Sequence, residues 1–156
     1  LLITTDQNQL VLDYKIMEQT VDQTETLPLA RRLFERYGEE AFGSMSFDKG
    51  FSKEADREEL ERQVGLVVMP KKGRRNSQDR ERESAPSFLK TKNQHSAVES
   101  EINSLEHHGL NRCPDKGMIG YQRYVGLGIL AYNLHQIGKR LLAKKRAAQE
   151  KRKAAA

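Results

Sequence analysis

The sequence predicts an α/β fold, in which a mixed sheet is flanked by helices and followed by one long basic helix. Stretches that alternate apolar and polar residues, as strands do, take turns with stretches of helical periodicity in the order strand, strand, helix, strand, helix, strand. The chain of 156 residues, 37% hydrophobic and 31% charged, has the size and composition of one globular domain with a single core.

The first predicted elements are a hairpin and a helix. LLITT and LVLDYKIM are apolar runs on either side of the turn sequence DQNQ, which is typical of two antiparallel strands. TETLPLARRLFERYG then predicts a helix with Thr24 or Thr26 as its N-cap and Gly38 at its end. Its apolar side chains recur on one face: Leu27, Ala30, Phe34 and Tyr37.

A strand–helix–strand unit follows. In GSMSFDKGF, Met45 and Phe47 alternate with serines, which predicts a short strand ending at Asp48. SKEADREELERQVG predicts a helix capped by Ser52, and LVVMP predicts a buried strand closed by Pro70. Because two strands of one sheet joined by a helix are parallel with a right-handed crossover, these segments should form a β-α-β unit.

Composition changes abruptly after this unit. Residues 70–93 are polar and highly charged, which predicts a linker or a surface insertion with a helical turn around SQDRERES. Residues 94–110 predict an amphipathic helix that docks on the core through Val98, Ile102 and Leu105.

The last predicted element is a long helix that starts near Tyr121 and continues into a basic tail. Its first part should be core, because its apolar side chains lie close to one stripe. The stripe comprises Tyr121, Tyr124, Val125, Ile129, Tyr132 and Ile137, widened by Leu127, Leu130, Leu134 and Leu141. We expect one domain over residues 1–142 and a basic tail over residues 143–156.

The net charge of +5 is a property of the C-terminal end. From Lys139 to Lys153 there are eight Lys or Arg residues and one Glu, a net charge of +7, which leaves −2 for the rest of the chain. Such a segment either binds polyanions in a salt-dependent way or keeps the end of a helix soluble.

The sequence predicts neither export nor membrane insertion. No stretch reaches the apolar length needed to cross a bilayer, and the N-terminus lacks the pattern of a signal peptide. Cys113 is the only cysteine, so no internal disulfide can form and a cytoplasmic location is expected. The chain begins without Met and with an apolar stretch at its edge, which is typical of a fragment cut through a strand.

Two carboxylates occupy positions at which a metal site could form. Asp48 follows a strand, at the edge where sites of open α/β sheets lie, although an Asp before a Gly is also a common turn residue. Glu99 belongs to a polar row of the 94–110 helix that is either a solvated face or a set of ligands. The other members of that row are His95, Asn103 and Glu106. Carboxylates from different elements can hold a pair of Mg²⁺ ions.

Four blocks of the chain together resemble the C-terminal part of bacterial insertion-sequence transposases of the DDE class. They are SMSFDKGFSKEADREELE, VGLVVMPKKGR, HSAVESEINSLEHHGLNRC and YQRYVGLGILAYNLHQIG, and they occur in the family's order. The resemblance, which covers the chain from about Leu10 to Leu142, implies a ribonuclease H-like fold with Asp48 as the second catalytic acid and Glu99 as the third. It further implies that both acids bind Mg²⁺ or Mn²⁺, and that a homodimer cleaves double-stranded DNA at the element's ends and joins it to target DNA.

The chain departs from the family's pattern at two places. Many relatives have an Arg four residues before the Glu and a Lys seven residues after it, whereas this chain has His95 and Glu106 there. The family's first acid lies on the first strand of the sheet. Because only two strands precede the first helix here, we expect that strand and its acid to lie before residue 1. Asp6 and Asp13 are candidates for the first acid by residue type only.

Two further clusters suggest binding chemistry. The cations that follow the last strand either contact DNA backbone phosphates or form a solvated charge run. These cations are Lys71, Lys72, Arg74 and Arg75. His107, His108 and Cys113 are close in sequence but lack the paired ligand spacing of a zinc site.

Two hypotheses for function follow from the sequence. The first is a transposase fragment that processes DNA, and the second is a non-catalytic nucleic-acid-binding protein that uses its basic tail. An Asp on a strand encoded directly upstream would separate them.

Overall fold

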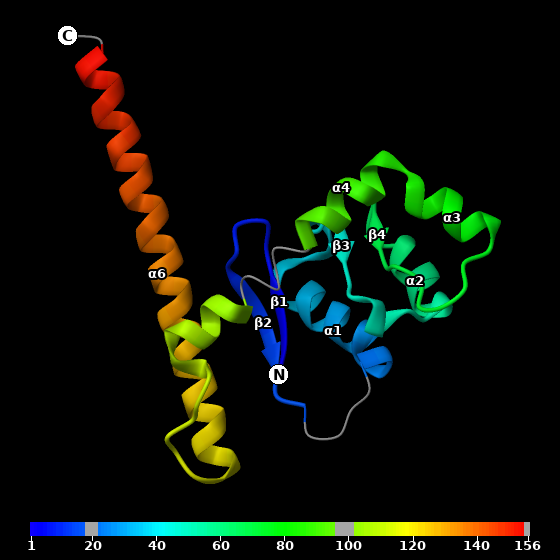
Figure 1. Ribbon diagram of the computed structural model, residues 1–156, viewed down its shortest axis with the longest axis horizontal. Coiled ribbons are helices and arrows are strands. Elements are labelled where there is room, and N and C mark those ends of the chain that lie inside the picture. Colours follow the sequence, from blue (N-terminus) through cyan, green and yellow to red (C-terminus); the bar gives the residue numbers. More distant parts are fainter. Residues whose placement is uncertain (18–21, 96–101, 155–156) are drawn as a thin grey trace. The chain divides into compact units, whose positions relative to one another are not determined.

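The structure is a computed structural model that describes residues 1–17, 22–95 and 102–154 (Figure 1). It is a mixed α/β protein with small sheets and a long C-terminal helix. The chain divides into two compact units, which are described separately below. Unit 1 comprises Leu1–Leu2 and Met17–Val98, and unit 2 comprises Ile3–Ile16 and Glu99–Ala156.

The described strands form two two-stranded sheets, whereas the sequence predicts a single mixed sheet. β1 (Leu2–Thr5) pairs with β2 (Val11–Lys15), and β3 (Met45–Ser46) pairs in parallel with β4 (Val67–Val68). The single mixed sheet stays a prediction, because the two pairs of strands belong largely to different units and alternating polarity identifies strands without specifying which of them pair.

In unit 1, α1 (Asp22–Tyr37) includes both of its expected N-caps. Thr26 is fully buried and its hydroxyl donates to the carbonyl oxygen of Gln23 at 3.4 Å, so it bonds back into the helix instead of capping it. The helix ends as predicted at Gly38, whose backbone has φ 84° and ψ 148°, a conformation that is essentially restricted to glycine.

The buried face of α1 is rotated from the predicted one. Leu29, Ala30 and Leu33 are buried, whereas Tyr37 is 41% exposed. Leu27 and Phe34, which the sequence places on the same apolar face as Ala30, are only half-buried. The buried face also includes Thr26, a polar residue. A prediction from apolar periodicity therefore does not recognise this face as the buried one.

The predicted β-α-β unit is present, with α2 (Glu54–Glu61) between β3 and β4. Met45 and Phe47 are buried as expected, and the Phe47 N–H donates to the Val68 carbonyl oxygen at 2.8 Å. The N-cap of α2 is Lys53 instead of Ser52. The Ser52 hydroxyl is used elsewhere in unit 1, as described with the candidate site.

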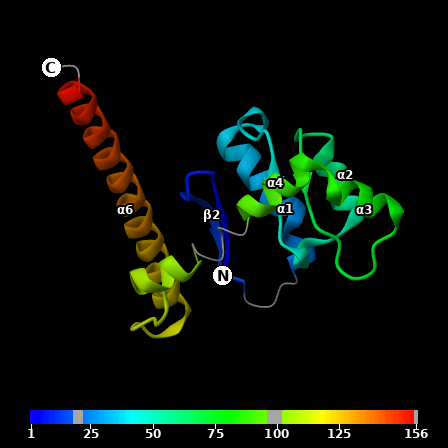
Figure 2. The ribbon, with the colours of Figure 1, turned by 45° about the horizontal axis from the view of Figure 1, so that its top comes forward.

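Residues 70–93, predicted as a linker or a surface insertion, belong largely to two helices. These are α3 (Ser77–Ser84) and α4 (Pro86–His95), which Figure 2 shows as separate helices. Ala85 divides them with ψ 135°, because a residue before proline disfavours the helical conformation. α4 contacts both β3 and β4, and its Phe88 is only 2% exposed.

Unit 2 is built on α6 (Gly117–Ala154), one uninterrupted helix (Figure 1). Residues 102–105 are helical and lead into the π-helical turn η3 (Glu106–Leu110), which packs on α6. The core of this unit combines β2, the helical segment before η3, and α6. It consists of Val11, Leu105, Val125, Ile129 and Tyr132, with Ile3, Ile16, Leu110 and Tyr121 at its edge.

Only part of the expected apolar stripes is buried in unit 2. Leu105 is 3% exposed as predicted, but Ile102 is 46% exposed, and Val98 lies outside the described residues. On α6 the widening leucines and Ile137 are exposed, because the hairpin and η3 pack on the opposite face of the helix. α6 passes through residue 143 without a break, so the basic tail continues the core helix. None of the helices in the described ranges offers the long apolar stretch that a bilayer-spanning segment needs.

Candidate functional site

Asp48 lies two residues after β3, beyond the carboxyl end of the strand. Its backbone is extended, with φ −71° and ψ 164°, and its carbonyl oxygen accepts the Phe51 N–H at 3.1 Å, which starts the 3-10 turn η2 (Lys49–Phe51). The Asp48 side chain makes no capping hydrogen bond to this turn, and the residue is exposed. Asp48 is therefore a turn residue, the alternative that the sequence left open, but its carboxylate does not cap the turn.

The chain segments that follow β3 and β4 meet at one edge, because the two strands are parallel. Ser52, after β3, accepts a hydrogen bond from the Lys72 N–H, after β4, at 3.1 Å. Both segments, with the starts of α2 and α3, line a polar pocket of about 170 Å³. Its lining is Ser52, Lys53, Glu54, Arg57, Met69, Lys71, Lys72, Asp79 and Arg82.

Two of the four predicted DNA-binding cations form ion pairs with carboxylates of α3. Lys71 Nζ lies 2.7 Å from Asp79 Oδ2, and Arg75 Nε lies 2.8 Å from Glu83 Oε2. Both carboxylates are buried, and Glu83 Oε1 also accepts the Lys71 backbone N–H at 2.8 Å. Lys71 and Arg75 thus attach α3 to the segment after β4, and a DNA phosphate would have to compete with these pairs.

Asp79 also has a shifted pKa. The Lys71 ammonium that ion-pairs with it, the Asn76 N–H and the charge of Arg82 together hold the pKa of Asp79 below its ordinary value of 3.8, against the opposite effect of burial. Asn76 and Asp79 also form a capping box at the start of α3, in which each side chain accepts the backbone N–H of the other residue at 3.0 Å or less.

Lys72 and Arg74 differ from their two neighbours. Both are exposed, and within the described part of the chain neither side chain takes part in an ion pair. Of the four predicted cations, these two are therefore the ones whose charge is open to an anionic partner.

Glu99, the second predicted metal ligand, lies outside the described residues. Of its row, His95 ends α4, and Asn103 and Glu106 are exposed. Whether Asp48 and Glu99 face one another therefore stays a prediction. Asp48 by itself presents open carboxylate oxygens, the hard ligands that fit Mg²⁺.

The two candidates for the first acid have different environments. Asp6 is a turn residue: its Oδ1 accepts the N–H groups of Asn8 and Leu10, both at 2.8 Å, and its Oδ2 accepts the Asn8 side-chain amide at 3.0 Å. Asp13 lies on β2 and is 5% exposed. The hydrogen bonds of Asp6 leave its carboxylate committed to the hairpin turn.

The described residues do not form a zinc site. Cys113 Sγ lies 3.6 Å from the carbonyl oxygen of Asp115 as a weak donor, and the His108 side chain is outside the described set. Over the ranges that the structure describes, no three His, Cys, Asp or Glu side chains group together closely enough to hold a metal ion.

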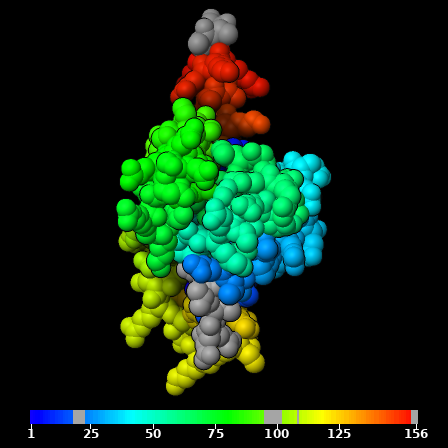
Figure 3. Space-filling view, turned by 90° about the vertical axis from the view of Figure 1, so that its right-hand side faces the viewer, coloured from blue at the N-terminus to red at the C-terminus, as the bar shows by residue number. Residues whose placement is uncertain are grey.

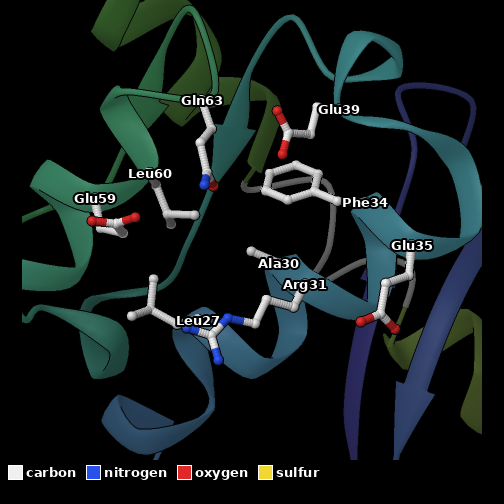
Figure 4. Close-up of a pocket in the computed structure, with 9 residues that line it drawn as sticks. All are labelled: Leu27, Ala30, Arg31, Phe34, Glu35, Glu39, Glu59, Leu60 and Gln63. Atoms are coloured by element: carbon white, nitrogen blue, oxygen red, sulfur yellow. The ribbon is translucent and has the colours of Figure 1, made fainter.

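Sequence reasoning missed a groove between α1 and α2, shown in Figure 4. It has a volume of about 220 Å³. Its floor contains Leu27, Phe34 and Leu60, and its rim carries Arg31, Glu35, Glu39, Glu59 and Gln63. The signal in the sequence was the apolar spacing of Leu27 and Phe34, which by itself indicates only one face of a helix.

The C-terminal end of α6 carries the densest positive charge. Residues 143–153 are helical and all exposed, and Figure 3 shows their side chains on the surface of this view. The cations in this stretch are Lys144, Lys145, Arg146, Lys151, Arg152 and Lys153. Cations at a helix C-terminus also interact favourably with its dipole, so the exposed charge does not oppose the helix.

Comparisons with known proteins add no relative to these observations. No family model, no curated protein and no solved structure matches the chain. A functional proposal therefore depends on the residues described above and on the motifs of the sequence.

Proposed function

We propose that this chain is the C-terminal part of a DDE transposase catalytic domain with a ribonuclease H-like fold. Its reaction would be hydrolysis of a phosphodiester bond at the end of a mobile element, followed by attack of the freed 3′-hydroxyl on target DNA. The active complex would be a homodimer working on double-stranded DNA in the bacterial cytoplasm, at the nucleoid.

The position of Asp48 is the single observation that supports this proposal best. Its carboxylate is exposed, is not used by the adjacent turn, and follows a strand that pairs in parallel with β4. Active-site carboxylates of open α/β sheets lie at this edge. The four sequence blocks that resemble the transposase family assign the second catalytic acid to the same residue.

Asp48 and Glu99 would hold Mg²⁺ or Mn²⁺. The ions would supply stabilisation of negative charge on the attacking and leaving oxygens of the phosphodiester. The contribution of the chain is to position the two carboxylates from separate elements, one after β3 and one on the segment after α4.

DNA would be held by the charges that the fold leaves open. Lys72 and Arg74 are exposed on the segment after β4, whereas Lys71 and Arg75 are held by Asp79 and Glu83. We therefore assign backbone phosphate contacts first to Lys72 and Arg74.

The test is metal-dependent cleavage of DNA that carries the element's ends. The assay compares residues 1–156 with a protein extended at its N-terminus by the residues encoded upstream. Residues 1–156 alone should be inactive, because two acids are too few to hold two divalent ions close together. The extended protein should cleave, and Asp48→Ala or Glu99→Ala should abolish cleavage.

Glu58→Ala is the matched control for this assay. Glu58 is an exposed carboxylate on α2 of the same unit, and its replacement should leave cleavage unchanged. Cleavage by residues 1–156 that survives Glu99→Ala would contradict both the proposal and the role of Glu99.

The exposed basic end of α6 favours a second candidate, a non-catalytic nucleic-acid-binding protein. This candidate expects salt-dependent DNA binding by residues 1–156. It also expects no cleavage by the extended protein under any metal condition, which distinguishes it from the transposase.

A further inference from the structure

The polar pocket lined by the segments after β3 and β4 carries an excess of positive charge, and we call it the cationic pocket. Five of its nine lining residues are basic and two are acidic, which gives the lining a net charge of +3. The basic residues are Lys53, Arg57, Lys71, Lys72 and Arg82, and the acidic ones are Glu54 and Asp79. All nine belong to unit 1, so the shape of the pocket does not depend on where unit 2 lies.

Close ion pairs hold three of these five cations. They are Lys71 with Asp79 (2.7 Å), Lys53 with Asp56 (2.9 Å), and Arg57 with Glu54 (3.5 Å) and Glu61 (2.7 Å). Lys72 is different, because it is exposed and its side chain takes part in no ion pair within the described part of the chain. The fifth cation, Arg82, is held only loosely.

The Arg82 guanidinium lacks hydrogen-bond acceptors. Its Nη2 lies 3.8 Å from Asp79 Oδ1 and 4.0 Å from Glu83 Oε1, and both distances are longer than a hydrogen bond. Its Nε is buried and finds no acceptor among the residues that the structure describes. A buried donor without an acceptor costs free energy, and a charged one costs more. This side chain is therefore suited to a ligand that supplies acceptor atoms.

Neutral donors also lie at the pocket. The Ser52 hydroxyl accepts the Lys72 N–H at 3.1 Å and keeps its own hydrogen to donate. Lys53 is the N-cap of α2, and its side chain makes no capping hydrogen bond to the first N–H groups of the helix. Because such N–H groups and the helix dipole attract anions, they add to the effect of the charged side chains.

We propose that the cationic pocket binds a phosphate group. Phosphate presents several acceptor oxygens, and a guanidinium binds it through parallel N–H···O hydrogen bonds. Arg82 and Lys72 would supply the charge that is not already paired, and Ser52 would supply a neutral donor. This inference does not rest on the proposed transposase activity, because it needs neither Asp48 nor Glu99.

The first test is a titration of residues 1–156 with inorganic phosphate at constant ionic strength, followed by isothermal titration calorimetry. One phosphate per chain should bind, with a Kd of about 1 mM or less. Arg82→Gln should weaken binding about tenfold or more, because it removes a charged donor that has no other acceptor.

Arg80→Gln is the matched control. Arg80 is an exposed cation on the same helix, α3, but it does not line the pocket, so this variant should bind phosphate as the wild type does. Absence of saturable binding by the wild-type chain, or equal losses in Arg80→Gln and Arg82→Gln, would overturn the proposal.

A second pair of variants keeps the test valid if Arg82→Gln fails to fold. Lys72 and Arg74 are both exposed, but only Lys72 lines the pocket. Lys72→Gln should lower the affinity for phosphate severalfold, and Arg74→Gln should leave it unchanged. Equal phosphate affinities of these two variants would contradict the pocket. The proposed DNA contacts treat both residues alike, so DNA binding by the same variants tests that proposal separately.

A comparison of three small molecules identifies the source of the phosphate group. Deoxyadenosine 5′-monophosphate that binds more tightly than inorganic phosphate indicates a phosphate ester as the ligand, and the reverse order indicates free phosphate. Deoxyadenosine lacks the phosphate group and should not bind. Deoxyadenosine that binds as tightly as its monophosphate would show that the pocket does not recognise phosphate.

Discussion

The side-chain amide of Asn133 on α6 makes two hydrogen bonds to the backbone of Val11 on β2. Asn133 Oδ1 accepts the Val11 N–H, and Nδ2 donates to the Val11 carbonyl oxygen, both at 2.9 Å. Val11 is 7% exposed, so water cannot easily replace these bonds. One side-chain amide thus satisfies both backbone polar groups of Val11.

Replacing this amide should destabilise unit 2. Asn133→Ala leaves the Val11 N–H and carbonyl without their partner, which should lower the free energy of unfolding by about 1–3 kcal/mol. Gln122→Ala, an exposed amide on the same helix, should change it little. Urea unfolding followed by the near-UV signal of the buried Tyr132 measures both variants. Equal stability of the two variants would show that the Val11 groups do not need Asn133.

At the scale of elements, local sequence patterns predicted the structures that depend only on residues close together in the sequence. The hairpin and the β-α-β unit follow from alternating polarity and turn residues, and the structure contains both. The charged segment after β4 was harder to predict. Asp79 and Glu83 are buried because Lys71 and Arg75 pair with them, and composition alone makes such residues look solvated.

The same limit applies to the candidate site: features set by neighbouring residues could be predicted, and those set by distant contacts could not. The position of Asp48 after a strand could be predicted from its neighbours, and the structure places it there with an open side chain. Which of the four cations are open to an anionic partner could not be predicted, because it depends on carboxylates eight residues further along the chain in both pairs. Glu99 lies outside the described residues, so its role stays a prediction.

The attachment of α3 should depend on pH. The lowered pKa of Asp79 means that its ionised form stabilises the folded state above its ordinary value of 3.8, and that this contribution is lost as pH falls through the folded-state value. Asp79→Asn should therefore be less stable than wild type at neutral pH, and the gap should close in acid. Denaturant unfolding at several pH values measures the gap. Glu58→Gln, an exposed acid, should show no such convergence, and a gap independent of pH would contradict the ion pair.

For the molecule as a whole, charge is divided unevenly along the chain. The end of α6 is strongly positive, while the rest of the chain has a net charge of −2. Binding to polyanions should therefore depend mainly on this end, and folding should not, because its described residues are all exposed.

Deleting residues 143–156 tests this separation. DNA affinity should fall, and the slope of log K against log salt should become less negative by about 0.9 for each phosphate that the shortened protein no longer neutralises. The melting temperature should stay close to that of the full chain. A full-length variant with Gln in place of the six cations should reproduce the weaker binding. A melting temperature lowered as much as by a core substitution would show that the segment packs.

The continuity of α6 has a geometric consequence for those cations. A charged segment on a flexible linker would sample many positions and would lose conformational entropy on binding a ligand. Here the last turns extend a helix that is clamped by its own core, so the charges lie along a rod that projects about 18 Å beyond Leu142. Because the helix is rigid, the cations have a fixed distance and direction from the hairpin. A polyanion that binds them must therefore run at that distance and in that direction.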